Sequence, residues 1–204
     1  MRSARHKNDD LHGNVPDNSP VVLLLIDVIN DLDFPGNANL LKQAPILAEN
    51  IRKLKARCRR KGIPVIYVND NRNKWRSDIF SVIEYCRGNG KGRVLVESLI
   101  PSPADYFVLK PKHSAFYATP LDTLLVYMKT RTVILAGLTT ASCILLTAGE
   151  IYIRDLKLFV PSDCVAGLRP MDHRKALDLM RISFRADTRP AKNLNLKILL
   201  RESI

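Results

Sequence analysis

The sequence lacks the features that mark membrane-spanning and secreted proteins. Its longest apolar runs, 21–26 and 133–136, are far shorter than the roughly 20 residues that a membrane-spanning helix needs. Residues 1–20 are polar and hold no apolar segment of the kind that a secretory signal peptide contains. We therefore expect a cytoplasmic protein without a membrane span, in which residues 1–19 form a disordered tail.

Cysteine is scarce, and its spacing argues against a disulfide scaffold and a zinc module. The chain has no CxxC pair and no Cys/His cluster at zinc-site spacing; its four cysteines are Cys58, Cys86, Cys143 and Cys164. In a chain of 204 residues without a signal peptide, reduced thiols are the better interpretation. We expect neither a metal ion nor another cofactor.

Two sequence motifs are also absent, one for a serine nucleophile and one for a phosphate-binding loop. No GxSxG motif is present, so a serine nucleophile of the α/β-hydrolase kind is not indicated. The glycine-rich run at 88–93, GNGKGR, does not complete the GxxxxGK[ST] motif and follows no buried strand. We expect this run to be a flexible surface turn.

The residues that are present indicate a globular α/β domain. The chain is 46% hydrophobic, and 32 Lys+Arg against 20 Asp+Glu give it a net charge of +12. Its length predicts one domain, residues 20–204. Short apolar runs are typical of strands buried on both faces of a parallel sheet, and they occur at 21–26, 64–68, 106–109, 133–136 and 158–160.

Helical patterns separate most of these runs. Apolar residues spaced by three and four predict a helix from Leu40 that stops at Gly62. Further helices are predicted at 121–128, from Thr139 or Thr140 to about Tyr152, and at 171–184. Alternating strands and helices predict a Rossmann-like, three-layer α/β/α fold around a parallel sheet. In such sheets, ligands bind beyond the carboxyl ends of the strands.

Three polar residues stand at that edge of the predicted sheet. Asp27 follows the first apolar run, Lys110 follows the third, and Cys143 comes shortly after the fourth. Cys143 is expected in the first turn of a helix, where the helix dipole can lower a cysteine pKa to about 3.5–7.5. A buried, unreactive cysteine is an equally open interpretation from position alone.

The segments around these residues resemble the isochorismatase-like cysteine hydrolases. They are VVLLLIDVINDLDFPG at 21–36, VLKPKHSAFYATPLDTLL at 108–125 and VILAGLTTASCILLTA at 133–148. The resemblance implies a six-stranded sheet in the order 3-2-1-4-5-6 and a cis peptide near Leu138 and Thr139. It implies that Asp27 is the general base, Lys110 the supporting lysine and Cys143 the nucleophile, and that related folds often form dimers or tetramers.

The implied reaction is hydrolysis of a C–N bond in a small amide or N-carbamoyl compound through a thioester. Members that cleave the vinyl ether of isochorismate typically have Gly where Cys143 stands, and Ile29 replaces a Gln that is frequent in the family. Backbone N–H groups at Thr139 and Cys143 are expected to hold the oxyanion. Candidate substrate-binding residues are Arg72, Trp75, Phe116 and Tyr117.

Three alternatives remain. A vinyl-ether hydrolase related to isochorismatase is the first, and a catalytically inactive scaffold is the second. Nucleic-acid binding is the third, and we rank it low because no recognition motif accompanies the basic residues. Those residues crowd one predicted helix: Arg52, Lys53, Lys55, Arg57, Arg59, Arg60 and Lys61.

We predict that catalysis does not depend on a divalent metal. Nicotinamidase-like members of the family carry an Asp-x-His metal motif, but the matching stretch here, 67–75, has Arg72 two residues after Asp70. A guanidinium is not a good transition-metal ligand. Metal analysis and assays after chelation test this. Stoichiometric Zn, Fe or Mn, with activity lost on chelation and restored by the metal, would contradict it.

Overall fold

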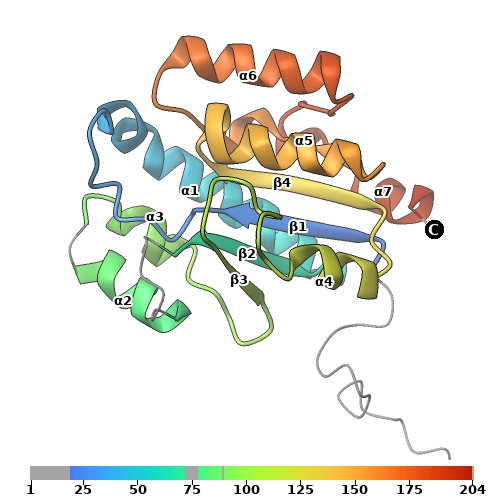
Figure 1. Cartoon of the computed structure of the whole chain (residues 1–204), viewed down its shortest axis with the longest axis horizontal. Helices are drawn as coiled ribbons and strands as arrows, with labels where there is room; N and C mark the ends of the chain where they lie inside the picture. Colours follow the sequence, from blue (N-terminus) through green and yellow to red (C-terminus); the bar gives the residue numbers. More distant parts are fainter. Residues whose placement is uncertain (1–18, 72–77, 89, 204) are drawn as a thin grey trace, which may run out of the picture.

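Parallel strands form the centre of the molecule, as the apolar runs predict (Figure 1). The computed structural model describes residues 19–71, 78–88 and 90–203. All strand pairs in the sheet run parallel, so the carboxyl ends of the strands meet at one edge. The strands are β1 Val21–Ile26, β2 Val65–Asp70, β3 Tyr106–Lys110, β4 Thr132–Leu138, β5 Lys157–Phe159 and β6 Val165–Ala166.

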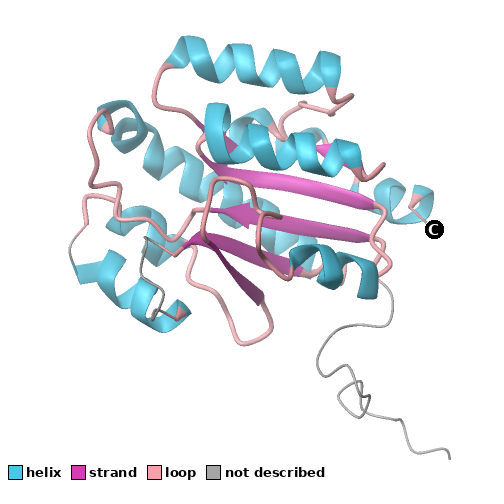
Figure 2. Cartoon of the chain, viewed as in Figure 1, coloured by secondary structure: helices cyan, strands magenta, loops and turns pink. Residues whose placement is uncertain are grey.

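Helices cover both faces of this sheet, which confirms the three-layer α/β/α prediction (Figure 2). Alternate residues of β1 pack into two separate cores because strand side chains point to opposite faces. The first core packs against α1 and the second against α4, α5 and α6. The helices are α1 Ala38–Arg59, α2 Ile79–Gly88, α3 Arg93–Ser98, α4 Leu121–Tyr127, α5 Leu145–Ile153, α6 Pro170–Ser183 and α7 Leu196–Glu202.

The strand order agrees with the implied one except at the last strand. The sheet runs β3-β2-β1-β4-β5, and β6 pairs with β4 instead of continuing beyond β5. The two last strands share one side of β4, because β5 pairs with Thr132–Ile134 and β6 pairs with Gly137 and Leu138. The two-residue β6 was not predictable from an apolar run, since it is too short to show one.

Several features differ from the sequence-based expectations. Ser19, which we expected in the tail, is buried, and its backbone N–H donates to the Met128 carbonyl. The helices α3 and α7 were not predicted, because they have only 6 and 7 residues, too few for a clear apolar period. The helix expected from Thr139 or Thr140 begins as a π-helical turn, Thr140–Ile144, before α5.

Part of the glycine-rich run at 88–93, expected to be a flexible surface turn, packs against the protein. Gly92 is buried, and its N–H donates to the Asp31 carbonyl at 2.7 Å. A Cβ at Gly92 would lie 2.2 Å from the Asn30 carbonyl oxygen, so only glycine permits this approach. Gly92 therefore packs backbone to backbone against the loop that follows β1.

No helix within the described ranges is both long enough and apolar enough to cross a membrane. This agrees with the short apolar runs of the sequence.

Gly137→Ala is expected to destabilise the fold by more than about 2 kcal/mol. Gly137 pairs with Ile26 in the β1–β4 ladder at φ +122°, and a Cβ there would lie 2.0 Å from the Ile26 carbonyl oxygen. Gly149→Ala is the matched control, because a Cβ in this part of α5 meets only the Phe184 ring at 3.5 Å and alanine favours a helix. Thermal and urea unfolding measure both. Equal stability of the two variants would contradict the close-approach argument.

Candidate active site

A cavity of about 530 Å³ opens at the carboxyl edge of the sheet. This is the edge where ligands bind in parallel α/β sheets. Its walls come from the loop after β1, the end of β2, the loop after β3 and the turn between β4 and α5. The lining residues are Asp27, Asn30, Asp31, Asp33, Phe34, Asp70, His113, Leu138, Thr139, Ser142, Cys143 and Leu168.

Asp27 follows β1 and lines this cavity, with only 5% of its surface exposed. Its backbone has a left-handed conformation, with φ +53°, which aspartate tolerates better than most residues. Its Oδ1 accepts a hydrogen bond from the Asp70 backbone N–H at 2.8 Å. The carboxylate is therefore held in place by the neighbouring strand.

Lys110 is the last residue of β3, and none of its surface is exposed. Its Nζ lies 2.9 Å from Asp27 Oδ2 and 3.9 Å from Asp70 Oδ2. The same Nζ donates to Cys143 Sγ at 3.6 Å. The structure thus brings together Asp27, Lys110 and Cys143 from three separate segments of the chain.

Cys143 lies in the π-helical turn, not in the first turn of an α-helix as expected. The Thr139 carbonyl accepts hydrogen bonds from the N–H groups of Ser142 and Ile144, which closes this turn. The peptide bond between Leu138 and Thr139 is cis, in agreement with the family resemblance. Cys143 is 9% exposed, and it reaches the cavity floor.

The acidity of the thiol also differs from the expectation. Burial, together with the negative charge of Asp27, raises the pKa of the Cys143 thiol to about 12, although Lys110 opposes this. This direction is opposite to the lowering that a helix dipole alone would produce. At neutral pH the sulfur carries its proton, and a neighbouring base has to remove it.

The other two charged groups respond to burial and to each other. Burial raises the pKa of Asp27, while the Lys110 charge and the Cys143 hydrogen bond act in the opposite direction. Burial alone would lower the pKa of Lys110, but the charges of Asp27 and Cys143 outweigh it and raise that pKa. Lys110 therefore holds its proton more tightly than a free lysine does, and Asp27 has an increased affinity for a proton.

The sequence reasoning missed His113. This residue follows β3 by three positions, lines the cavity and places its Nδ1 3.6 Å from Cys143 Sγ. The signal was available, because His113 stands inside the segment quoted around Lys110 and histidine is the most frequent general acid or base in enzymes. The loop that brings it back to Cys143 was not predictable from that segment.

Two of the four candidate substrate-binding residues, Phe116 and Tyr117, do not belong to the described lining of the cavity. Phe116 is buried in the second core, with the Arg154 guanidinium 4.2 Å from its ring centroid, and Tyr117 is 60% exposed. Arg72 and Trp75 lie outside the described residues.

The Ile29 departure from the family pattern has a structural explanation. Its side chain is 1% exposed and packs in the first core, away from the described lining of the cavity. Its backbone N–H and carbonyl bond the Asn69 side-chain amide at 3.1 and 2.8 Å. Ile29 therefore anchors the loop after β1 to β2.

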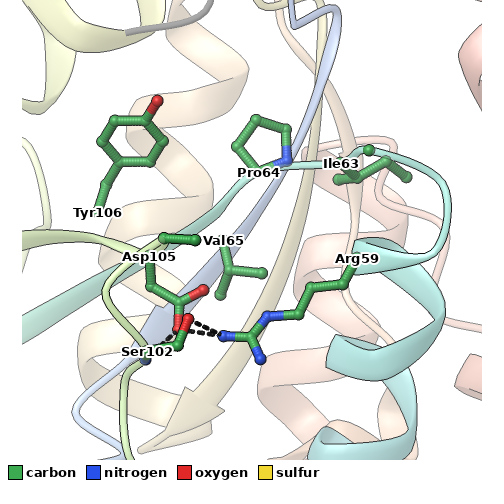
Figure 3. Close-up of a pocket in the computed structure, with 9 residues that line it drawn as sticks. Arg59, Ile63, Pro64, Val65, Ser102, Asp105 and Tyr106 are labelled. Carbon is green, nitrogen blue, oxygen red and sulfur yellow. Dashed lines mark hydrogen bonds and ion pairs between the residues drawn. The ribbon is translucent and has the colours of Figure 1, made fainter. Parts of the chain in front are cut away.

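A second cavity, of about 440 Å³, lies at the opposite, amino edge of the sheet (Figure 3). Arg59 points toward the loop before β3, where its guanidinium donates to Ser102 Oγ and Asp105 Oδ2 (Figure 3). The buried Asp105 carboxylate also pairs with Lys55 at 3.0 Å. The ion pair between Arg59 and Asp105 lines this cavity and stabilises the fold. The described lining residues include no cysteine or histidine.

Most cations of the basic helix α1 have partners within the protein. Arg52 and Lys53 pair with Glu49, and Lys55 and Arg59 pair with Asp105. Arg57 donates to the backbone carbonyls of Ala191 and Leu194. Most of the positive side chains of α1 therefore have contacts within the protein.

The fold and the site together match one known family. The family model for the isochorismatase domain matches residues 21–189. The chain belongs to the isochorismatase family. It is 36% identical over 158 residues to the uncharacterized isochorismatase family protein YaaI of Bacillus subtilis strain 168, a match that covers 78% of this chain and 87% of that protein.

Two solved structures are similar to this chain. N-carbamoylsarcosine amidase from Thermoplasma acidophilum is similar with a TM-score of 0.65 and 27% identity, over 86% of this chain and 98% of that one. An isochorismatase family protein from Desulfovibrio vulgaris has a TM-score of 0.71 and 24% identity, over 90% and 100% of the two chains. The second similarity supports the fold alone.

In this isochorismatase-family protein, Asp27→Asn is expected to make Cys143 react faster with iodoacetamide. The Asp27 carboxylate contributes to the raised pKa of the thiol, so its removal lowers that pKa. Each unit of decrease raises the thiolate fraction about tenfold. Lys110→Met should slow the same reaction, because the Lys110 charge favours the thiolate. Mass spectrometry at about pH 8 measures both rates. An unchanged rate in Asp27→Asn would contradict this interpretation.

Proposed function

We propose that this protein is a cysteine-dependent hydrolase that cleaves a C–N bond of a small amide or N-carbamoyl compound through a thioester. One observation carries the proposal. Cys143 Sγ lies at the floor of a cavity, 3.6 Å from the Nζ of a fully buried Lys110 that is itself 2.9 Å from Asp27 Oδ2. A thiol, a base and a cation in contact are the parts that nucleophilic cysteine catalysis requires.

The first half of the reaction forms the thioester. Asp27, whose raised pKa suits it to accept a proton, takes the proton of the Cys143 thiol as the sulfur attacks the substrate carbonyl carbon. Lys110 stabilises the negative charge on the sulfur during this step. When the C–N bond breaks, Asp27 returns the proton to the departing nitrogen, so that ammonia or an amine leaves.

The carbonyl oxygen gains negative charge while the carbon is tetrahedral. We assign the backbone N–H groups of Thr139 and Cys143 to this oxyanion, since both residues line the cavity beside the sulfur. Preorganised N–H donors commonly account for about 10²–10³ in turnover. Water then hydrolyses the thioester, releasing the acid and regenerating the thiol.

The cavity limits the substrate class. A volume of about 530 Å³ falls within the range of about 300–1,000 Å³ that small-molecule sites occupy. The similarity to a protein named N-carbamoylsarcosine amidase supports an amide or ureido compound as the substrate. Arg72 and Trp75 stay as predicted substrate contacts, whereas the positions of Phe116 and Tyr117 disfavour that role. A homo-oligomer, cytoplasmic localisation and a single domain also remain predictions.

The alternative functions receive less support. A scaffold without activity has no need of a buried Lys110 in contact with both Asp27 and Cys143. Vinyl-ether hydrolysis would leave the Cys143 thiol without a role. Nucleic-acid binding through α1 is disfavoured because most of its cations are paired within the fold.

Cys143→Ala and Asp27→Asn are each expected to abolish most ammonia release on a panel of small amides and N-carbamoyl compounds. The double variant should be little worse than either single one, because nucleophile and base act as a unit. Cys164→Ala is the matched control: Cys164 is fully buried, outside the described cavity lining, and should retain turnover. Near-native turnover in Cys143→Ala would overturn the proposal, since Asp27 and water alone would then carry the reaction.

A further inference from the structure

The proposed reaction leaves one step without an assigned group. After the amine departs, a water molecule has to attack the acyl carbon on Cys143, and a base has to take its proton. Asp27, which takes the thiol proton in the first half of the reaction, is only 5% exposed. Its Oδ1 accepts from the Asp70 N–H at 2.8 Å and its Oδ2 lies 2.9 Å from Lys110 Nζ, so its carboxylate faces buried groups of the protein.

His113 also approaches the sulfur. Its Nδ1 lies 3.6 Å from Cys143 Sγ, the same distance as Lys110 Nζ. His113 is an exposed residue that lines the cavity, whereas Lys110 has no exposed surface and Asp27 is 5% exposed. His113 is therefore the more accessible of the two bases to water from solvent.

We propose that His113 is a further catalytic residue, the general base that activates water for hydrolysis of the Cys143 thioester; this rests on the proposed function. The imidazole takes one proton from water as the oxygen forms its bond to the acyl carbon. The C–S bond then breaks, the carboxylic acid leaves, and the proton on His113 passes to the sulfur. Atoms and charges balance without another reactant.

The arrangement divides the two halves of the reaction between two bases. Asp27 serves thioester formation from the buried side, close to Lys110, and His113 serves thioester hydrolysis from the open side. A neutral imidazole has one ring nitrogen that accepts a proton, and a positioned general base contributes about 10²–10⁴ to a rate. Loss of His113 should therefore slow hydrolysis and leave thioester formation largely intact.

p-Nitrophenyl acetate tests this division, because its leaving group departs without a proton from the enzyme. Release of nitrophenolate reports acetylation of Cys143 as an initial burst, and the subsequent steady rate reports hydrolysis. In His113→Gln we expect the burst to persist at close to one equivalent and the steady rate to fall about 100-fold. Intact mass spectra should show acetylated Cys143 accumulating. Lys112→Gln, an exposed neighbour outside the described cavity lining, should behave as the unmodified protein.

Several outcomes would overturn the role of His113. An unchanged steady rate in His113→Gln would contradict the proposal. A burst rate and a steady rate that fall together would also contradict it, because a parallel decrease indicates a merely structural role for His113. Circular dichroism and a second variant, His113→Phe, separate misfolding from loss of the base. Failure of the proposed function looks different: nitrophenolate release would then be the same in Cys143→Ala as in the unmodified protein, with no acetylated cysteine in either.

Discussion

The ammonium group of Lys110 has no exposed surface, and its burial is compatible with folding because carboxylates face it. Asp27 Oδ2 lies 2.9 Å away and Asp70 Oδ2 lies 3.9 Å away. Removing one partner of such a pair commonly costs about 3–5 kcal/mol, because the remaining charge stays buried and unpaired. This requirement ties the ends of β1, β2 and β3 together, and the cavity floor is built on it.

The same ion pair controls the proton on Cys143. Lys110 favours the thiolate, but burial and the Asp27 carboxylate disfavour it, and the balance leaves a pKa of about 12. A resting thiol of this kind is protected from indiscriminate alkylation and oxidation, since the thiolate is the reactive form. Reactivity then depends on a base that accepts the proton only when a substrate carbonyl is in place.

Much of the fold was predictable from local patterns. β1 was predicted with its observed bounds, because each of its residues is apolar and buried. The convergence of Asp27, Lys110 and Cys143 was predictable because polar residues after buried strands meet at one edge of a parallel sheet. The approach of His113 to Cys143, and the positions of Phe116 and Tyr117 outside the described cavity lining, were not predictable, because all three residues lie in a loop whose path no periodic pattern describes. The role of Gly92 was missed for a related reason: its partner, the loop at Asn30 and Asp31, is distant in sequence.

The sequence by itself determined the class of fold, the edge where the site lies and the three segments that form it, because strand burial and strand ends leave a local record in residue type. Only the tertiary structure decided the protonation of Cys143, since its pKa depends on burial and on charges supplied by other strands. It also decided that His113 approaches the sulfur, and that β6 pairs beside β5 on β4. These features arise from distances between residues far apart in the chain, which no single segment encodes.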